Sequence, residues 1–232
     1  MNDTDLHSLF TDHTKEVIAC ELCPRLVEYR QEVARVKRRA FRDEEYWGRP
    51  VPGFGDENAR VLIVGLAPGA HGSNRTGRMF TGDDSGKFLY SALFRAGFAN
   101  QPHGLSRDDG LKLRDIYITA VGRCAPPDNK PTNLELKNCQ PFLLQEMDLL
   151  TNLRGIVALG KIAYDVMVKI LIARNYKMPA IPFSHGSFCQ NSETGFWLLG
   201  SYHPSRQNTQ TRRLTETMYD DLWRVVRQQL EK

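Results

Sequence analysis

Four short apolar runs constrain the fold of this 232-residue chain more than any other feature of its sequence. They are rich in β-branched and aliphatic residues, as buried strands are, and they span Arg60–Gly65, Asp115–Val121, Gly155–Leu159 and Phe196–Gly200. Segments with helical spacing lie between and after them, at Ser85–Gly97, Leu134–Leu150, Lys161–Ala173 and about Leu214–Leu230. Strands that alternate with helices of this length form parallel sheets through right-handed crossovers. We therefore predict a three-layer α/β/α domain with a parallel sheet of about four strands.

In open α/β sheets, ligands bind outside the carboxyl ends of the strands. This rule directs attention to the loops that follow Gly65, Val121, Leu159 and Gly200. The length suits one domain over residues 1–232, with an N-terminal helical segment over about residues 1–45. Apolar residues recur there at helical spacing from Leu6 to about Tyr29, and residues 35–42 are basic.

The bulk composition permits a nucleic-acid partner without showing one, because the net charge is only +4. No apolar run approaches the roughly 18 residues that a membrane helix needs, so we expect no membrane association. The first ten residues have neither the basic start nor the apolar stretch of a signal peptide. We therefore expect a cytoplasmic protein, in which thiols stay reduced and cysteines serve as metal ligands or buried apolar residues.

Four of the five cysteines form two pairs. Cys20 and Cys23 make a C-x2-C pair followed by proline, and Cys124 and Cys139 are separated by fourteen residues. Four thiolates suit either a structural zinc or an iron–sulfur cluster, and the wide second pair favours the cluster without excluding zinc. The remaining alternative is four unrelated buried cysteines. Cys189 has no close partner in the sequence and is interpreted as a buried thiol.

The loop after the first strand, residues 65–86, contains six glycines and two arginines. Glycines let a backbone approach a ligand closely, yet this loop matches neither the Walker nor the Rossmann pattern. Asp83, Asp84 and Ser85 stand directly before a predicted helix, so any of the three could be its N-cap. Asp83 is therefore open to two interpretations, a catalytic carboxylate or a helix cap.

The loop after the fourth strand, residues 201–215, has three arginines, several amides and no acidic residue. Such a loop at the ligand end of a sheet suits phosphate contact and insertion into DNA. The predicted DNA-binding residues are Arg206, Asn208, Gln210, Arg212 and Arg213. His203 stands just after the strand and before a proline, which favours a functional role over a purely structural one.

The loop after the second strand carries two adjacent prolines that stiffen it. A stiff loop is a suitable mount for an amide that must recognise a ligand edge, and Asn129 occupies that place. The alternative is that Asn129 is an ordinary turn residue.

Together these motifs resemble the iron–sulfur uracil-DNA glycosylases, most closely their family 5, the type B enzymes, over nearly the whole chain. The motifs that carry the resemblance are Gly65-Leu-Ala-Pro-Gly, the run from His71 to Asp83, Cys124-Ala-Pro-Pro with Asn129-Lys-Pro, His203-Pro-Ser, and the four cysteines in order. Family 4 has an acidic residue just after the first strand, where this chain has Gly69, Ala70 and His71. That difference favours family 5.

The resemblance implies a uracil-DNA glycosylase-like fold and a [4Fe–4S] cluster held by Cys20, Cys23, Cys124 and Cys139, in place of zinc. It implies that Phe80 stacks on an extruded base, that Asn129 bonds the base edge and that His203 donates to a base oxygen. Asp83 matches the family's acidic residue at the end of the first motif. The implied substrate-binding set is Phe80, Asn129, Gly65, Ala67 and His71.

The expected activity is base-excision repair, by hydrolysis of the N-glycosidic bond of uracil and other deaminated bases in DNA. A base must be flipped out of the duplex before it can be attacked. Breaking its bond leaves positive charge on the sugar and negative charge on the base, which Asp83 and His203 would stabilise. We expect a monomer associated with the nucleoid. The rival hypothesis is an iron–sulfur DNA-binding or redox-sensing protein without glycosylase activity.

Overall fold

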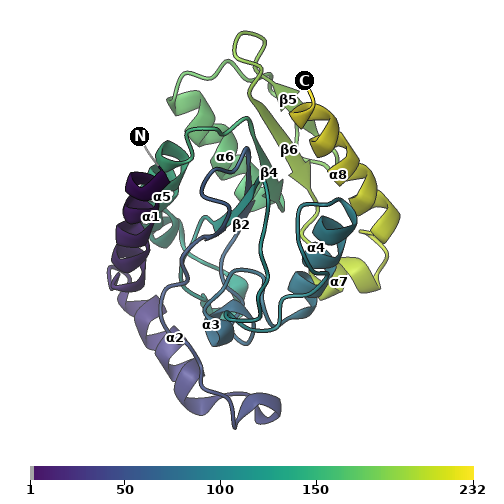
Figure 1. The fold of residues 1–232 in the computed structure, drawn as a ribbon. Helices are drawn as coiled ribbons and strands as arrows, with labels where there is room; N and C mark the ends of the chain where they lie inside the picture. Colours follow the sequence, from purple (N-terminus) through teal and green to yellow (C-terminus); the bar gives the residue numbers. More distant parts are fainter. Residues whose placement is uncertain (1–2) are drawn as a thin grey trace.

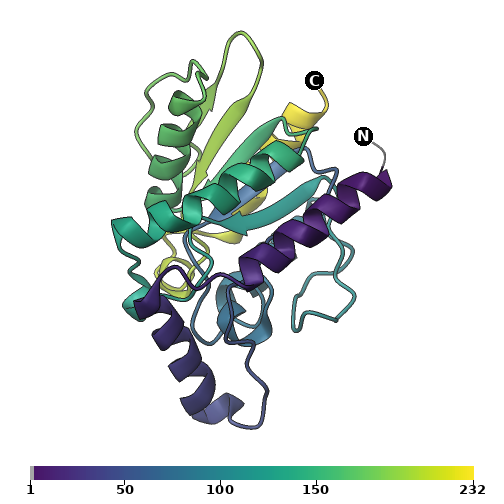
Figure 2. The ribbon, with the colours of Figure 1, turned by 90° about the vertical axis from the view of Figure 1, so that its left-hand side faces the viewer.

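The computed structural model describes residues 3–232 and has one sheet with helices on both faces (Figure 1 and Figure 2). Its central strands are β2 (Val61–Gly65), β3 (Ile116–Ala120), β4 (Gly155–Leu159) and β6 (Trp197–Ser201). They are mutually parallel and lie in the order β3-β2-β4-β6. All four strands that the sequence predicted are therefore present, and no end differs from its predicted position by more than one residue.

The sheet is nevertheless mixed and six-stranded, so the prediction of a purely parallel sheet of about four strands was wrong in this respect. β1 (Phe54–Gly55) pairs antiparallel with β3 at one edge, and β5 (Phe188–Gln190) pairs antiparallel with β6 at the other. Strands of two and three residues are too short to show a periodic pattern in sequence. β1 also lies in a segment rich in proline and glycine, where a loop was the natural expectation.

Alternate residues of each buried strand face opposite layers, which produces two separate cores. Ile63 and Ile118 pack toward α4 (Asp84–Arg95) and α8 (Glu216–Leu230). Leu62 and Val64 pack on the other face, toward α1, α5 and α6. Figure 1 shows these two groups of helices on either side of the sheet, which is the three-layer arrangement predicted from the sequence.

The remaining helices are α1 (Asp3–Ile18), α2 (Pro24–Val36), η1 (Arg39–Phe41), α3 (Ser73–Thr76), η2 (Pro127–Asn129), α5 (Asn133–Leu149), α6 (Lys161–Ala173) and α7 (Arg206–Gln210). The helical pattern from Leu6 to Tyr29 is thus divided between α1 and α2, with the C-x2-C pair at the break. Leu6 and Phe10 of α1 belong to one of the two cores, whereas α2 extends beyond the sheet, at the end where α3 and α7 lie (Figure 1). No helix among residues 3–232 is long and apolar enough to cross a membrane.

A buried carboxylate joins α5 to the sheet and to the N-terminal helix. Oε2 of Glu146, on α5, accepts hydrogen bonds from Thr119 Oγ1 at 2.6 Å and from Arg123 Nη2 at 2.5 Å. The Nε2 atom of His13, on α1, lies 3.5 Å from the other carboxylate oxygen. The positive charge of Arg123 and these donors hold the pKa of Glu146 below its usual value, although burial opposes the shift.

We predict that Arg123→Met will lower the free energy of unfolding by about 3–5 kcal/mol, because it leaves the buried Glu146 charge without its cation. Arg174→Met is the matched control, since Arg174 pairs with Asp148 at 2.7 Å on the surface. Its cost should be about 1 kcal/mol or less. Urea unfolding of both variants measures the difference, and equal costs would show that the buried pair has no special importance.

Candidate functional site

A pocket of about 440 Å³ lies at the carboxyl ends of the central strands, where the sequence predicted a ligand. Seven predicted site residues meet there, among them Phe80, Asp83, Asn129 and His203. Gly65, Ala67 and Arg206 also line it. They come from the loops that follow β2, β3 and β6, which are three of the four loops singled out from the sequence. After β4, α6 begins at once, and no residue of that loop is among the described lining residues.

Phe80 forms the apolar wall of the pocket. Its backbone has φ = 52°, in the left-handed region that a bulky side chain rarely adopts. The last residue of β2, Gly65, makes room for the ring, because a Cβ atom there would lie 3.0 Å from Phe80 Cζ. The ring centroid is 5.8 Å from that of His203, with 30° between the planes. A strained aromatic residue held between a strand end and a histidine is typical of a binding site.

Asp83 is both a helix cap and a pocket residue. Its Oδ1 accepts from the backbone N–H of Gly86 at 2.9 Å, at the start of α4. Its Oδ2 is directed at the first loop, where a Cβ on Gly72 would lie only 2.1 Å away. Burial raises the pKa of Asp83, and the hydrogen bond from Gly86 opposes the shift. The two interpretations left open by the sequence are therefore compatible, because the cap fixes one oxygen and orients the other.

His203 lies at the other strand end, after β6. Part of the side chain is accessible, yet the protein around the ring desolvates it and lowers its pKa to about 4. The imidazole is consequently neutral at physiological pH and offers one N–H donor. Its backbone carbonyl accepts from Asn208 Nδ2 at 2.8 Å, so Asn208 stabilises the segment that carries the ring.

Asn129 reaches the pocket from the loop after β3, at the end of η2. Asp128 and Asn129 both have positive φ, 53° and 56°, and asparagine tolerates this conformation better than most residues. Asn129 is exposed in this structure. Its amide is therefore accessible to a ligand entering the pocket.

The other predicted site residues differ in whether they line the pocket. His71 is not among the lining residues, and its Nδ1 lies 3.1 Å from the hydroxyl of Tyr46. Arg206 lines the pocket, whereas Arg212 and Arg213 are exposed farther along the chain. Gln210 is exposed as well.

The pocket residues that were not predicted as site residues include Arg38 and Ser73. Arg38 lies just beyond α2, and the sequence placed it only within a basic segment. Nothing in its local pattern connects it with loops that begin more than twenty residues later. Ser73 lies inside the first glycine-rich motif, so its proximity to Asp83 could have been inferred.

The four paired cysteines are free thiols and lie close enough to interact electrostatically. Burial raises the pKa of Cys124 to about 12, and the thiols of Cys139, Cys20 and Cys23 contribute to the shift. Asn138 Nδ2 donates to Cys23 Sγ at 3.4 Å, which joins α5 to the C-x2-C segment. The fold thus brings the two pairs together from opposite ends of a 120-residue span.

No group of three or more His, Cys, Asp or Glu side chains within residues 3–232 is spaced to hold a single metal ion. A four-iron cluster is wider than one ion and separates its thiolate ligands further, so this observation concerns mononuclear sites only.

Arg30 provides an independent test of the cysteine site. Its guanidinium is buried, with 2% of the side chain exposed, and its Nε has no hydrogen-bond partner. Its Nη atoms donate only to backbone carbonyls, those of Gly48 at 2.7 Å and Cys20 at 3.4 Å. The charge of Arg30 acts on Cys124. A buried cation is costly without a counter-charge, and a thiolate-bound cluster with net negative charge would supply one.

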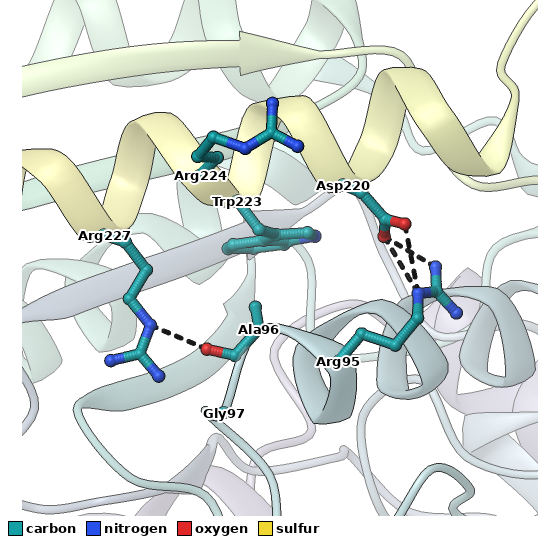
Figure 3. A pocket seen from close by; sticks show the side chains of 7 residues that line it. All are labelled: Arg95, Ala96, Gly97, Asp220, Trp223, Arg224 and Arg227. Carbon is teal, nitrogen blue, oxygen red and sulfur yellow. Dashed lines mark hydrogen bonds and ion pairs between the residues drawn. The ribbon is translucent and has the colours of Figure 1, made fainter.

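A second hollow, of about 420 Å³, lies between α4 and α8, away from the strand ends (Figure 3). It is rich in arginine, but these side chains have partners within the protein. Arg95 pairs with Asp220 at 2.7 Å, Arg224 with Asp221 at 2.5 Å, and Arg227 donates to the carbonyl of Ala96 at 2.7 Å. The hollow therefore offers less free positive charge than its composition indicates.

Comparison with known proteins agrees with this site. The family model described as the uracil DNA glycosylase superfamily matches residues 52–227. A type-5 uracil-DNA glycosylase of Mycobacterium leprae is 53% identical over 210 residues, covering 90% of each chain. One from Thermus thermophilus is 54% identical over 201 residues, with 87% of this chain and 89% of the relative covered.

A more distant type-5 relative extends the similarity to the archaea. The protein from Pyrobaculum aerophilum is 46% identical over 218 residues, covering 94% of this chain and 92% of its own. With a family model that covers most of its length, the chain belongs to the uracil DNA glycosylase superfamily and, within it, to the type-5 family.

Proposed function

We propose that this protein is a DNA repair glycosylase that flips uracil out of DNA and hydrolyses its N-glycosidic bond. The observation that carries the proposal is the meeting of a partly buried carboxylate, Asp83, and a neutral imidazole, His203, in one pocket at the strand ends. Bond cleavage separates charge, and the two groups suit the two charges that form. Its type-5 relatives, which bear the name uracil-DNA glycosylase, support the same substrate.

The pocket has the features needed to bind a flipped base. The planar ring of Phe80 offers a stacking surface, and Asn129 presents an amide that can donate to and accept from a base edge. Asn129 has positive φ at the end of a proline-stiffened loop, so its position is set before a ligand arrives. Small residues in the pocket wall, Gly65 and Ala67, leave room for the base.

Asp83 acts on the sugar side of the reaction in this proposal. One oxygen is fixed by the helix cap, so the other is held in place without rotating. An ionised carboxylate there favours the positive charge that develops on the sugar, and it can also orient the attacking water. Burial makes the carboxylate more basic than usual, which suits acceptance of a proton from that water.

His203 acts on the departing base. Because the imidazole is neutral, it stabilises the developing negative charge by donating a hydrogen bond, and it need not transfer a proton. Asn208, predicted from the sequence to contact DNA, holds the carbonyl of His203 and is better assigned to positioning that segment. The remaining basic residues of 206–213 are exposed and are proposed to contact phosphates.

We further propose that Cys20, Cys23, Cys124 and Cys139 hold a [4Fe–4S] cluster. Four free thiols that interact with one another, and the buried Arg30 without an acidic partner, support this ligand set. When bound, the cluster would cross-link the C-x2-C segment to the loop after β3 and to α5. Other deaminated bases as substrates, a monomeric state and association with the nucleoid belong to the same proposal.

The central test is release of uracil from labelled single- and double-stranded DNA under single-turnover conditions. We expect Asp83→Asn to lower the rate by about 10²- to 10³-fold with little loss of affinity, because its contact develops only in the transition state. Asparagine remains an adequate helix cap, so stability should be preserved. Asp165→Asn, at an exposed ion pair on α6, is the control. Tight binding by the wild type without any base release would instead support the non-catalytic hypothesis.

The pKa shifts predict the pH profile of base release. His203 has a pKa of about 4 and stays neutral across about pH 5.5 to 8, so no step should occur near the ordinary histidine value of about 6.5. Asp83 has a raised pKa and must be ionised, so the rate should fall on the acid side, above the ordinary carboxyl range. Asp83→Asn should remove that acid limb. A step near pH 6.5 that disappears in His203→Ala would contradict this assignment.

The cluster proposal predicts a brown protein with broad absorption near about 400 nm, because iron–sulfide–thiolate centres give charge-transfer bands. Cys124→Ala should bleach this colour, lower the iron content and reduce the melting temperature, since metal binding contributes to folding. Cys189→Ala is the control, because Cys189 is a buried thiol on the opposite edge strand, β5. Anaerobically purified wild type that is colourless and contains one zinc would refute the proposal.

A further inference from the structure

The segment that follows α2 forms a short basic arm, defined here as Lys37–Arg42. Lys37 ends α2 with φ = 56°, which turns the chain into the single helical turn of η1. Arg38, Arg39 and Arg42 have exposed side chains. Figure 1 shows this arm beyond the sheet, at the end that carries α3 and α7.

The arm is fixed to the catalytic loop. The guanidinium of Arg75, in the first motif, lies 4.0 Å from the centroid of the Phe41 ring. The backbone N–H of Arg38 donates to the hydroxyl of Tyr46 at 3.4 Å, and that hydroxyl lies 3.1 Å from His71. These contacts place the arm against the loop that presents Phe80 and Asp83, so its position is defined.

Arg38 belongs to the wall of the substrate pocket itself, together with Asp83 and His203. Burial lowers the pKa of His71, and the positive charges of Arg38 and Arg75 lower it further, in agreement with a guanidinium close to the first loop. No ion pair within residues 3–232 involves Arg38 or Arg39.

The acidic residues nearby do not neutralise the arm. Asp43 approaches only Arg42, at 3.7 Å and with both side chains highly exposed. Glu44 forms an ion pair with Arg75, and Glu45 is exposed to solvent. Arg38, which lines the pocket, and its neighbour Arg39 therefore have no acidic partner among residues 3–232 and keep their donors available.

A second cation from a distant part of the sequence also borders the pocket. Arg206, at the start of α7, lines the pocket and is only 4.0 Å from Asp84, a loose ion pair between exposed groups. The pocket thus lies between two positive borders, one from the N-terminal third of the chain and one from its C-terminal end. A flipped nucleotide carries a phosphate on each side, and both phosphates must remain close to the protein while the base is in the pocket.

We propose that the basic arm is a second DNA-backbone contact, on the side of the extruded nucleotide opposite α7, with Arg38 and Arg39 on phosphates that flank the lesion. The inference rests on the proposed function for its geometry. The contacts are to phosphate, so they should add affinity and register without base specificity.

The test is the salt dependence of binding to an undamaged duplex, which requires no base release. Arg38→Ala/Arg39→Ala should lower the slope of log K against log salt by about two units, since each phosphate contact contributes about 0.9. Arg35→Ala/Arg224→Ala is the matched control, because it removes two exposed arginines that already pair with Glu32 and Asp221. Its slope should stay close to that of the wild type. Arg38→Lys/Arg39→Lys keeps the charges and should restore the slope.

The outcomes separate this inference from the proposed function. An arm variant with wild-type slope and wild-type affinity overturns the inference, even if the wild type releases uracil. A flattened slope in the arm variant alone supports the inference, whether or not the wild type releases a base. If no base is released, only the proposed function fails. Two further outcomes would overturn the inference: a flattened slope that the Arg38→Lys/Arg39→Lys variant does not restore, and a flattened slope that the Arg35→Ala/Arg224→Ala control shares. In either case the effect would not come from cationic phosphate contacts at the arm.

Discussion

The carboxylate of Glu146 is the point on which the separate parts of this fold converge. Three elements contact it at once: β3 and the cysteine loop donate hydrogen bonds through Thr119 and Arg123, and α1 brings His13 Nε2 to 3.5 Å. A buried charge of this kind is tolerable only when its partners are all in place. The buried ion pair of Arg123 and Glu146 therefore contributes more to the relative placement of α5, β3 and the cysteine loop than to net stability. Arg123 precedes Cys124, so the same interaction that anchors α5 also fixes where this proposed cluster ligand lies.

How far the fold could be predicted depended on burial. The four central strands are buried on both faces and appear in the sequence as continuous aliphatic runs, and α6 was located to the residue because its pattern is uninterrupted. The edge strands β1 and β5 gave no signal, because pairing with a neighbour, and not a local pattern, creates a strand of two or three residues. The division of the N-terminal helical pattern at Cys20–Cys23 also depends on a tertiary feature, the meeting of this turn with α5.

The candidate site was predictable in proportion to how local its residues are. The topological rule directed attention to the loops after β2 and β6, which contain Phe80, Asp83 and His203, whereas the roles of these residues came from the family resemblance. Asp83 stands where the first loop meets α4, which explains why it is both cap and pocket residue. Asn208 was assigned to DNA for its chemistry, but its amide is used inside the protein, which only coordinates could show. Arg38 was missed because the contact that brings it to the pocket, through the arm and Tyr46, leaves no periodic trace in the sequence.

The contacts around Arg30 give a physical reason for placing four cysteines outside the pocket. The side-chain amide of Asn74, in α3, donates to the backbone carbonyl of Arg30 at 3.3 Å. The backbone carbonyl of Asn74 accepts from the N–H of Gly48, and the guanidinium of Arg30 donates to the carbonyl of Gly48. The backbone N–H of Asn74 also bonds Gly69, on which Asp83 packs. With the proposed cluster as the counter-charge for Arg30, this cycle of bonds would transmit rigidity from the cysteines to the catalytic carboxylate. That proposed role requires no electron transfer, because a static cross-link between the C-x2-C segment and the loop after β3 would be sufficient to hold α2 against α3 and the first loop.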